Sequence, residues 1–351
     1  MGIIQSLEGL SDLGFGQHFA PFMVRSDFKN SEWSPPEVVP YGSLGLDPAA
    51  KVFHYGQEIF EGMKIYRSSK GKHLLFRPDA NIRRMKHSSE MLAMPEFPEK
   101  LFTQALRDLA AKVKAFVPER PGALYLRPTL LGVSTALGVA PAKEYVFFVL
   151  ASPVGGYFGA QDLERAACIN CQITSEFVRA VRGGLGTAKA GANYAASLRA
   201  VELAKKKGFS NVLFLDALER KFLEELSGMN VFLVTKDKKV LTPPLGDTIL
   251  AGITRDSLLQ LAPKLGYVAE ERKLTIEDLL EGLKTGAVTE AFACGTGATV
   301  SAITEFGWKD KNLAVGDKVA GPVTNHLYQQ LCAIQFGEDR TTFPQWSVAL
   351  D

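Results

Sequence analysis

A single lysine, Lys189, stands in a stretch of very small residues, GGLGTAKAGANYAAS. No acidic residue lies within five positions of it on either side. A lysine amine is nucleophilic at neutral pH only when its pKa is lowered, by burial or by a neighbouring cation. The stretch therefore indicates either an amine suited to forming a Schiff base with a carbonyl compound or an ordinary surface lysine in a glycine-rich turn.

Three further features could complete a site around such an amine. Glu224 and Glu225 offer a carboxylate within the apolar segment FLEELSGMN, and Tyr194 offers a hydroxyl shortly after the lysine. The expected helix start at Ile253 and Thr254, and the CGTGA turn, offer backbone N–H groups to a phosphate. A carboxylate for a pyridine nitrogen, a hydroxyl for a ring oxygen and an anion site are the parts that pyridoxal phosphate requires. Each has a structural alternative, such as a solvated turn at the glutamates or a helix cap at Thr254.

Several motifs, in order and spread over nearly the whole chain, carry a family resemblance. They are HYGQEIFEGMKIYR, LFRPDANIRRM, LYLRPTLLG, VGGYFG, FVRAVRGGLGTAKAGANYAASL, EELSGMNVF, TPPLGDTILAGITR and EAFACGTGA. With these motifs the sequence resembles the branched-chain amino acid aminotransferases, which are fold-type IV pyridoxal phosphate enzymes of the class IV aminotransferase family. The resemblance implies a pyridoxal 5'-phosphate cofactor, no metal, and an active site at the interface of two domains.

The resemblance also implies a role for individual residues. Lys189 is the Schiff-base lysine, Glu225 contacts the pyridine nitrogen, and Tyr194 contacts the ring oxygen. The residues expected to hold the phosphate are Arg77, Arg179, Ile253, Thr254 and Thr296. Those expected to contact the substrate are Tyr55, Phe60, Tyr125, Arg127, Tyr157, Thr296 and Gly297. Among these, Arg127 would receive a distal carboxylate, the amides of Thr296 and Gly297 the α-carboxylate, and Tyr55 and Tyr157 could serve a neighbouring subunit.

The implied reaction is ping-pong transamination between L-leucine, L-isoleucine or L-valine and 2-oxoglutarate, which gives the branched-chain 2-oxo acid and L-glutamate. Two alternatives remain within the same fold, a D-amino acid aminotransferase and an aminodeoxychorismate lyase. A third alternative is of another class, a non-catalytic module that binds a phosphate ligand. Such a module would not need Lys189, Tyr194 and Glu225 together.

The order of strand-like and helix-like segments predicts a mixed α+β protein. No GxGxxG follows a strand and no Gly-Lys-Ser/Thr is present in GGLGTAK, so a doubly wound sheet is not expected. At 351 residues the chain predicts two domains. We expect a small domain at 1–155, a linker at 156–170 around the glycine-rich VGGYFGAQD, and a large domain at 171–351.

Composition narrows the range of partners. Lys and Arg number 40 against 38 acidic residues, a net charge of +2, which gives no electrostatic argument for nucleic acid or a membrane. The N-terminal sequence has no basic start followed by an apolar core, so no secretory signal is expected. Four cysteines make no disulfide framework, and Cys168 and Cys171 of CINC fit two half-buried strand positions. We therefore expect a cytoplasmic enzyme with small-molecule substrates that forms a homodimer.

Overall fold

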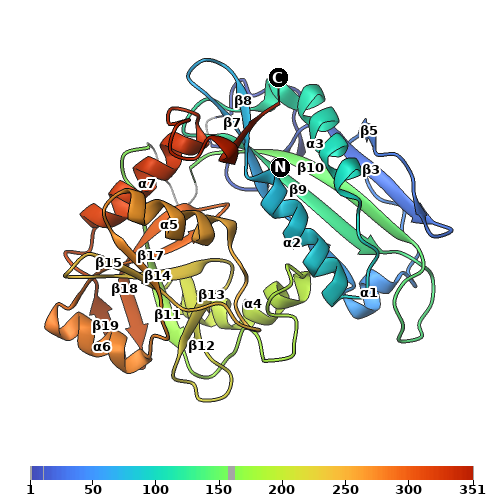
Figure 1. Ribbon diagram of the computed structural model, residues 1–351. Helices are drawn as coiled ribbons and strands as arrows, with labels where there is room; N and C mark the ends of the chain where they lie inside the picture. Colours follow the sequence, from blue (N-terminus) through green and yellow to red (C-terminus); the bar gives the residue numbers. More distant parts are fainter. Residues whose placement is uncertain (1, 11, 157–162, 351) are drawn as a thin grey trace. The chain divides into compact units, whose positions relative to one another are not determined.

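The chain folds into two compact units, which are described separately (Figure 1). The computed structural model describes residues 2–10, 12–156 and 163–350. The first unit comprises Met1–Gly156, Ala188–Ala192 and Ala333–Asp351, and the second comprises Tyr157–Thr187 and Asn193–Cys332. Lys189 thus belongs to the first unit, although the chain on both sides of it belongs to the second. The expected linker at 156–170 includes residues outside the described ranges, so its position stays a prediction.

The first unit is built on one antiparallel sheet. Its strands are β3 (Phe22–Lys29), β4 (Glu32–Trp33), β5 (Glu37–Pro40), β6 (Glu58–Phe60), β7 (Met63–Arg67), β8 (His73–Phe76), β9 (Ala123–Gly132), β10 (Tyr145–Val154) and β20 (Ser347–Ala349). The order is β20-β8-β7-β9-β10-β3-β4, with β5 beside β3 and β6 beside β9. The short strands β1 (Gly2–Ile3) and β2 (His18–Phe19) pair with each other.

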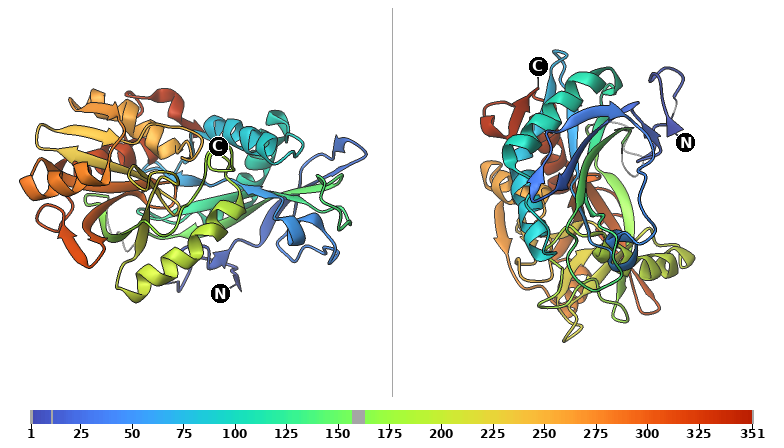
Figure 2. Two further views of the ribbon diagram at one scale, coloured as in Figure 1. Left: turned by 90° about the horizontal axis from the view of Figure 1, so that it is seen from below. Right: turned by 90° about the vertical axis from the view of Figure 1, so that its right-hand side faces the viewer.

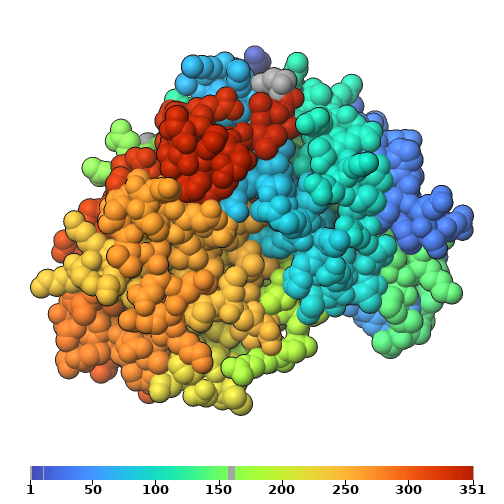
Figure 3. Space-filling view, in the orientation of Figure 1, coloured from blue at the N-terminus to red at the C-terminus, as the bar shows by residue number. Residues whose placement is uncertain are grey.

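Two helices, α2 (Pro78–Met91) and α3 (Glu99–Val113), cover one face of this sheet (Figures 1 and 2). Pro78 begins α2, because its fixed φ suits the first helical position. Helix α3 buries Phe102, Leu106 and Leu109 at helical spacing, and Phe102 packs against Phe147 of β10. The opposite sides of α2 and α3 form part of the surface seen in Figure 3. The remaining helices of the unit are α1 (Lys51–Tyr55) and the 3₁₀ turns Lys114–Phe116 and Pro344–Trp346.

The second unit is a mixed sheet that closes on itself. Its strands are β11 (Ala167–Thr174), β12 (Asn211–Leu215), β13 (Leu223–Leu226), β14 (Asn230–Thr235), β15 (Lys239–Thr242), β16 (Val268–Glu271), β17 (Val288–Gly295), β18 (Thr299–Trp308) and β19 (Lys311–Ala314). The order is β13-β12-β11-β18-β17-β14-β15-β16, and β13 also pairs with β14. A closed ring is therefore formed by the six strands β13, β12, β11, β18, β17 and β14. The sheet combines parallel pairs of β11 with β12 and β18 and antiparallel pairs such as β14 with β17, as a mixed α+β fold requires and a doubly wound sheet does not.

The helices of the second unit are α4 (Gly191–Lys206), α5 (Ile253–Lys264), α6 (Ile276–Thr285) and α7 (Pro322–Gln335). Helix α4 begins, and α7 ends, in the first unit. Thr275 and Asp278 form the predicted capping box at the start of α6. Helix α5 begins at Ile253, within one residue of the predicted start. Among the described residues no helix has the length and apolarity needed to cross a membrane.

Candidate active site

Lys189 is held by its backbone in the first unit. Its N–H donates to Ser88 Oγ of α2 at 2.9 Å, and its carbonyl accepts from the Phe60 N–H of β6 at 3.0 Å. The neighbouring Ala190 forms a bridge to Ile59. The Lys189 amine lies 4.6 Å from the centre of the Phe60 ring. These contacts fix the backbone of Lys189 and place its amine beside the Phe60 ring.

The same Phe60 ring contacts a second cation, Arg127 of β9. The Arg127 guanidinium lies 4.5 Å from the ring centre of Phe60 and 5.2 Å from that of Tyr125. Its Nε and Nη2 donate to the Tyr125 hydroxyl at 3.2 and 3.1 Å. Gly62 makes room for that hydroxyl, since a Cβ there would lie 2.1 Å from it. The structure therefore brings together four predicted residues, Phe60, Tyr125, Arg127 and Lys189.

Two carboxylates near Lys189 were missed from the sequence. Glu61 is fully buried and pairs with Arg84 of α2 through Nε at 2.7 Å and Nη2 at 2.8 Å, and it also accepts from Asn81 at 2.7 Å. Burial alone would raise the pKa of Glu61, but the Arg84 charge and hydrogen bonds, with smaller contributions from Lys189 and Asn81, lower it below its ordinary value. An acidic residue inside the apolar segment EIFEGM was the available signal.

The second carboxylate, Glu58, lies between charged neighbours. It accepts from the Gly191 N–H at 2.9 Å, so it anchors the residue two positions after Lys189. Burial raises the pKa of Glu58, while the Gly191 N–H and the charges of Arg127 and Lys189 oppose that rise. Glu58 therefore acts electrostatically on Lys189 and Arg127, the two cations beside the Phe60 ring (the Phe60 cluster).

Tyr55 and Arg77 also lie in the first unit. Tyr55 is 43% exposed at the end of α1, and its hydroxyl donates to the Leu137 carbonyl. Arg77 immediately precedes α2 with a φ of 49°, a strained conformation for a non-glycine residue. Its guanidinium lies 4.9 Å from the ring centre of Trp346, and its N–H donates to the Trp346 carbonyl at 2.7 Å. The C-terminal segment thus fixes both the backbone and the side chain of Arg77.

In the second unit, Glu225 of β13 is the centre of a buried polar group. Arg179 Nη2 lies 2.8 Å from Glu225 Oε1, which also accepts from the Leu250 N–H at 2.9 Å. Asn230 donates to Oε2 at 2.9 Å. These donors all favour the ionised carboxylate. Arg179 also donates to the carbonyls of Gly186 and Thr248, which hold its guanidinium beside Glu225. Its role at a phosphate stays a prediction.

The adjacent residue Glu224 points to the other face of β13, as the alternation of strand side chains requires. Its Oε1 accepts from the Thr248 hydroxyl rather than from an arginine. Tyr194 of α4 lies beside the turn that follows β13, because a Cβ on Gly228 would lie 3.4 Å from its ring. The roles of Glu225 at a pyridine nitrogen and of Tyr194 at a ring oxygen stay predictions.

The other residues of the second unit that are predicted to bind the phosphate or the α-carboxylate lie at two turns. Ile253 and Thr254 open α5, whose N-cap residue, Gly252, has no side chain to bond the first N–H groups. A Cβ on Gly252 would lie 2.0 Å from Asn230 Oδ1, so only glycine fits there. Thr296 and Gly297 form the turn between β17 and β18. Tyr157, the remaining predicted residue, lies outside the described residues.

These groups fit pyridoxal 5'-phosphate by their chemistry. A helix start with an N-cap that lacks a side chain suits a phosphate, and a buried, charge-supported carboxylate suits a protonated ring nitrogen. A lysine amine, such as that of Lys189 beside the Phe60 ring, can form a Schiff base with the cofactor's aldehyde. Within the described residues no group of His, Cys, Asp and Glu has the arrangement of a metal site.

Comparison with known proteins identifies the class. Residues 58–306 match the family model described as amino-transferase class IV. The chain therefore belongs to the class IV aminotransferase family.

Within that family, the similar proteins are branched-chain aminotransferases. The chain is 40% identical over 340 residues to branched-chain-amino-acid transaminase 1 of Bacillus subtilis (strain 168), covering 96% of this chain and 94% of that protein. It is 42% identical over 334 residues to the branched-chain-amino-acid aminotransferase of Mycolicibacterium smegmatis, covering 93% and 90%. The fold agrees with the crystal structure of the Escherichia coli enzyme, with a TM-score of 0.77, 27% identity and coverage of 93% and 99%. It also agrees with the T.th. branched-chain amino acid aminotransferase solved with pyridoxamine 5'-phosphate, with a TM-score of 0.76, 26% identity and coverage of 93% and 98%.

Proposed function

We propose that this aminotransferase exchanges the amino group between L-leucine, L-isoleucine or L-valine and 2-oxoglutarate, with pyridoxal 5'-phosphate bound through Lys189. The observation that carries the proposal is the Phe60 cluster, in which the Lys189 amine and the Arg127 guanidinium flank one aromatic ring. An apolar ring beside a cation suits a site that must accept both a branched aliphatic side chain and the distal carboxylate of glutamate.

The cofactor, when bound, supplies an aldehyde that condenses with amines and a pyridine ring that withdraws electrons from the substrate Cα. Lys189 would hold it covalently between turnovers, directed by the backbone hydrogen bonds to Ser88 and Phe60. Once the substrate amine has displaced it, the Lys189 amine would take the proton from Cα as a general base. The same group would return a proton to Cα in the second half of a ping-pong cycle.

Glu225 would hold a proton on the pyridine nitrogen. Arg179, Asn230 and the Leu250 N–H contact its carboxylate at a position that is only 3% exposed, and these donors would favour the charged form. A charge fixed in a buried site acts more strongly than one in water and requires no reorganisation during the reaction. Tyr194 would donate to the ring oxygen, and the N–H groups that open α5, together with Thr296 and Arg77, would bind the phosphate.

In the substrate pocket, Phe60 and Tyr125 would pack on the aliphatic side chain of leucine, isoleucine or valine. Arg127 would pair with the distal carboxylate of glutamate or 2-oxoglutarate, and the Tyr125 hydroxyl fixes its guanidinium. The amides of Thr296 and Gly297 would receive the α-carboxylate. Tyr55 and Tyr157 would complete the pocket, in a homodimer, from a neighbouring subunit.

We also infer that the enzyme works in the reducing cytoplasm. All four cysteines are free thiols, and three of them, Cys171, Cys294 and Cys332, are buried. Cys168 and Cys171 lie on β11, in agreement with the strand assignment from the sequence. A homodimer is checked by sedimentation of the purified protein, for which a monomer at all concentrations is the contrary result.

A visible absorbance scan followed by a donor panel tests the function. The purified protein with added cofactor should show a visible band that disappears on treatment with borohydride. Mass spectrometry of the reduced protein should then locate the cofactor on Lys189. L-Leucine, L-isoleucine and L-valine should each give glutamate from 2-oxoglutarate, and D-amino acids and aminodeoxychorismate should not react. Reaction with only the last two groups of compounds would overturn the proposed specificity.

A further inference from the structure

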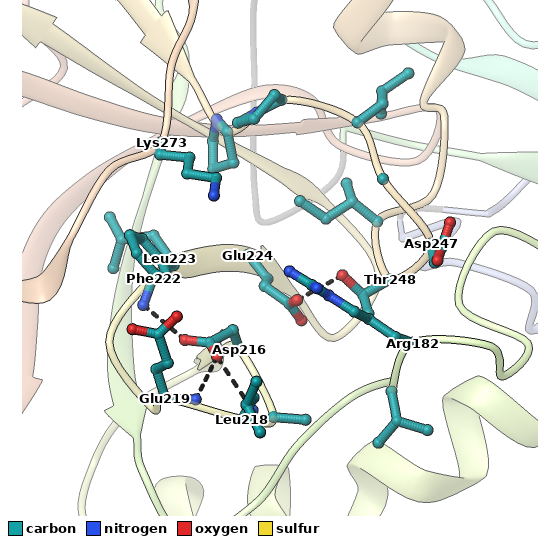
Figure 4. Close-up of a pocket in the computed structure, with 17 residues that line it drawn as sticks. Arg182, Asp216, Leu218, Glu219, Phe222, Leu223, Glu224, Asp247, Thr248 and Lys273 are labelled. Carbon is teal, nitrogen blue, oxygen red and sulfur yellow. Dashed lines mark hydrogen bonds between the residues drawn. The ribbon is translucent and has the colours of Figure 1, made fainter.

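A pocket of about 480 Å³ opens in the second unit beside β13 (Figure 4). It is lined by residues of the segments 181–182, 216–219, 222–224 and 243–249 and by Lys273. Its volume lies in the range of small-molecule sites. None of the residues assigned above to the cofactor or the substrate lines it. It is therefore distinct from the candidate active site.

Glu224 enters this pocket with an unused hydrogen-bonding atom. Glu224 is only 6% exposed, and its Oε1 accepts a hydrogen bond from the Thr248 hydroxyl. Its Oε2 is buried and has no hydrogen-bond partner among the described residues. A buried carboxylate oxygen without a donor is costly, so the position is suited to a ligand that brings a donor. Figure 4 shows the Glu224 side chain between β13 and Thr248, within the space that the lining residues surround.

Three further acids line the pocket, Asp216, Glu219 and Asp247, and the first of them is already engaged. Asp216 accepts from the backbone N–H groups of Leu218 and Glu219 through Oδ2, and from those of Lys221 and Phe222 through Oδ1. These bonds lower the pKa of Asp216 against the effect of its burial and fix the turn that follows β12. Glu219 and Asp247 are exposed to solvent, so Glu224 is the buried acid of the pocket with an oxygen left for a ligand.

The walls of the pocket are largely apolar. Leu223, the first residue of β13, and Phe222, which precedes it, form one wall. Ile249 lines the pocket from the loop before α5. Two leucines at the rim, Leu218 and Leu245, are 80% and 46% exposed. These surfaces would be removed from water by an aliphatic or aromatic group of a ligand.

Two cations complete the lining. Arg182 and Lys273 are both exposed, and neither forms an ion pair within the described part of the chain. The Lys273 amine lies 5.2 Å from the centre of the Phe222 ring, so its charge is held over an apolar wall. A ligand with a negative group could pair with either cation at the mouth of the pocket.

We propose that this pocket binds a free α-amino acid with an apolar side chain. The ammonium would donate to Glu224 Oε2, the carboxylate would pair with Arg182 and Lys273, and the side chain would pack on Phe222 and the rim leucines. Within the second unit, one residue contacts both Glu224 of this pocket and the ion-pair partner of Glu225. The Thr248 hydroxyl donates to Glu224, while its carbonyl accepts from Arg179, the ion-pair partner of Glu225.

The experiment is calorimetric titration of the holoenzyme with L-leucine after the cofactor has been fixed by borohydride, so that no amino group can be transferred. The titration should show saturable binding. Isoamylamine, which lacks the carboxylate, and 4-methylvaleric acid, which lacks the ammonium, should each bind at least about tenfold more weakly, because each loses a charged hydrogen bond. Glu224→Gln and Arg182→Gln should weaken L-leucine binding by at least about tenfold, and the matched control Glu202→Gln, on the exposed side of α4, should not.

Binding that is unchanged in both pocket variants would place L-leucine elsewhere and overturn the proposal, as would the absence of saturable binding. Glu224 is buried, so its variant is first compared with the wild type by thermal unfolding. Arg182 is exposed, and its variant keeps the test valid if the Glu224 variant does not fold. A protein that takes up no cofactor would contradict the proposed function, but the same titration of that protein would still test this pocket.

Discussion

The Arg179 guanidinium lies 2.8 Å from the Glu225 carboxylate, and both side chains are 4% exposed. Removing one member of a buried ion pair leaves the other charge without compensation, which costs about 3–5 kcal/mol. Asn230 and the Leu250 N–H add two more donors to the same carboxylate. The second unit therefore surrounds one buried carboxylate with several donors, which favour its charged form.

Glu225→Gln should retain the cofactor but lose at least ~10²-fold in kcat, because the charge stabilises mainly the transition state in which negative charge develops at Cα. The measurement is steady-state kinetics with L-leucine and 2-oxoglutarate, combined with cofactor absorbance. Glu277→Gln, on the first turn of α6, is the control and should keep wild-type kinetics. A Glu225→Gln enzyme with normal kcat would show that the pyridine nitrogen has another partner.

Lys189→Ala should abolish transamination while the protein still folds. The backbone N–H and carbonyl of Lys189 make the hydrogen bonds to Ser88 and Phe60, so loss of the side chain leaves them in place. Thermal unfolding should be close to that of the wild type, and borohydride should no longer attach the cofactor. Lys205→Ala, an exposed lysine of α4, serves as the control. Overall activity within tenfold of the wild type would show that Lys189 is not the essential amine.

Arg127→Gln should raise the apparent KM for acidic substrates more than that for aliphatic ones. If its guanidinium pairs with the distal carboxylate, its loss removes a charged hydrogen bond of about 1.5–3 kcal/mol, roughly ten- to hundredfold in apparent KM. The KM for glutamate and 2-oxoglutarate should rise by this factor and that for leucine should change little. Equal changes for both kinds of substrate would instead indicate that Arg127 supports Tyr125 and Phe60 structurally.

Local features of the fold were predictable from the sequence because local chemistry determines them. Thr275 and Asp278 form a capping box, the segment around Val240 returns as a hairpin, and the Gly295–Gly297 turn separates two strands. Each depends on residues a few positions apart. The hydrophobic pattern of α4 is less informative, since Leu198 is 62% exposed while Ala200 and Ala204 are buried. Small residues pack closely there, and hydrophobicity alone did not show which face was inside.

The sequence named candidate residues for the site but did not indicate the contacts that those residues make. The motifs located Lys189 and Glu225, but the pairing of Arg179 with Glu225, like that of Glu61 with Arg84, joins positions far apart in the chain. Such pairs depend on strand order and on which face of a strand a residue takes. An acid in an apolar segment, as Glu61 is, indicates a buried partner without saying which one.

Glu61→Gln should destabilise the first unit by about 3–5 kcal/mol, because it leaves Arg84 buried without its counter-charge. The measurement is chemical denaturation, with Glu90→Gln on the exposed side of α2 as the control. The folded-state pKa of Glu61 is lowered, so its contribution is fully present above the pKa of an unfolded glutamate and is lost as pH falls through the lower folded value. The difference between wild type and variant should therefore shrink only in acid. A difference that did not depend on pH would show that the pair is not held by charge.

Glu58→Gln should change how the enzyme's affinity for glutamate depends on pH. Burial raises the pKa of Glu58, and the charges of Arg127 and Lys189 act on it. While Glu58 is ionised, it compensates part of the positive charge that the distal carboxylate of glutamate would meet at Arg127. As pH falls through the raised pKa, Glu58 becomes neutral, and the attraction of Arg127 for that carboxylate increases.

The wild-type KM for glutamate should therefore fall as the pH is lowered through this range, by up to about tenfold for a partly screened charge. In Glu58→Gln the KM should already be low at neutral pH and should not change further. The measurement is the pH profile of KM for glutamate and for leucine, and the leucine profile, which involves no distal carboxylate, is the internal control. Since Glu58 also accepts from the Gly191 N–H, and glutamine can still accept there, the variant keeps that anchor near Lys189. The same pH dependence in wild type and variant would show that Arg127 does not sense Glu58, and would leave the discrimination of acidic from aliphatic substrates to other residues.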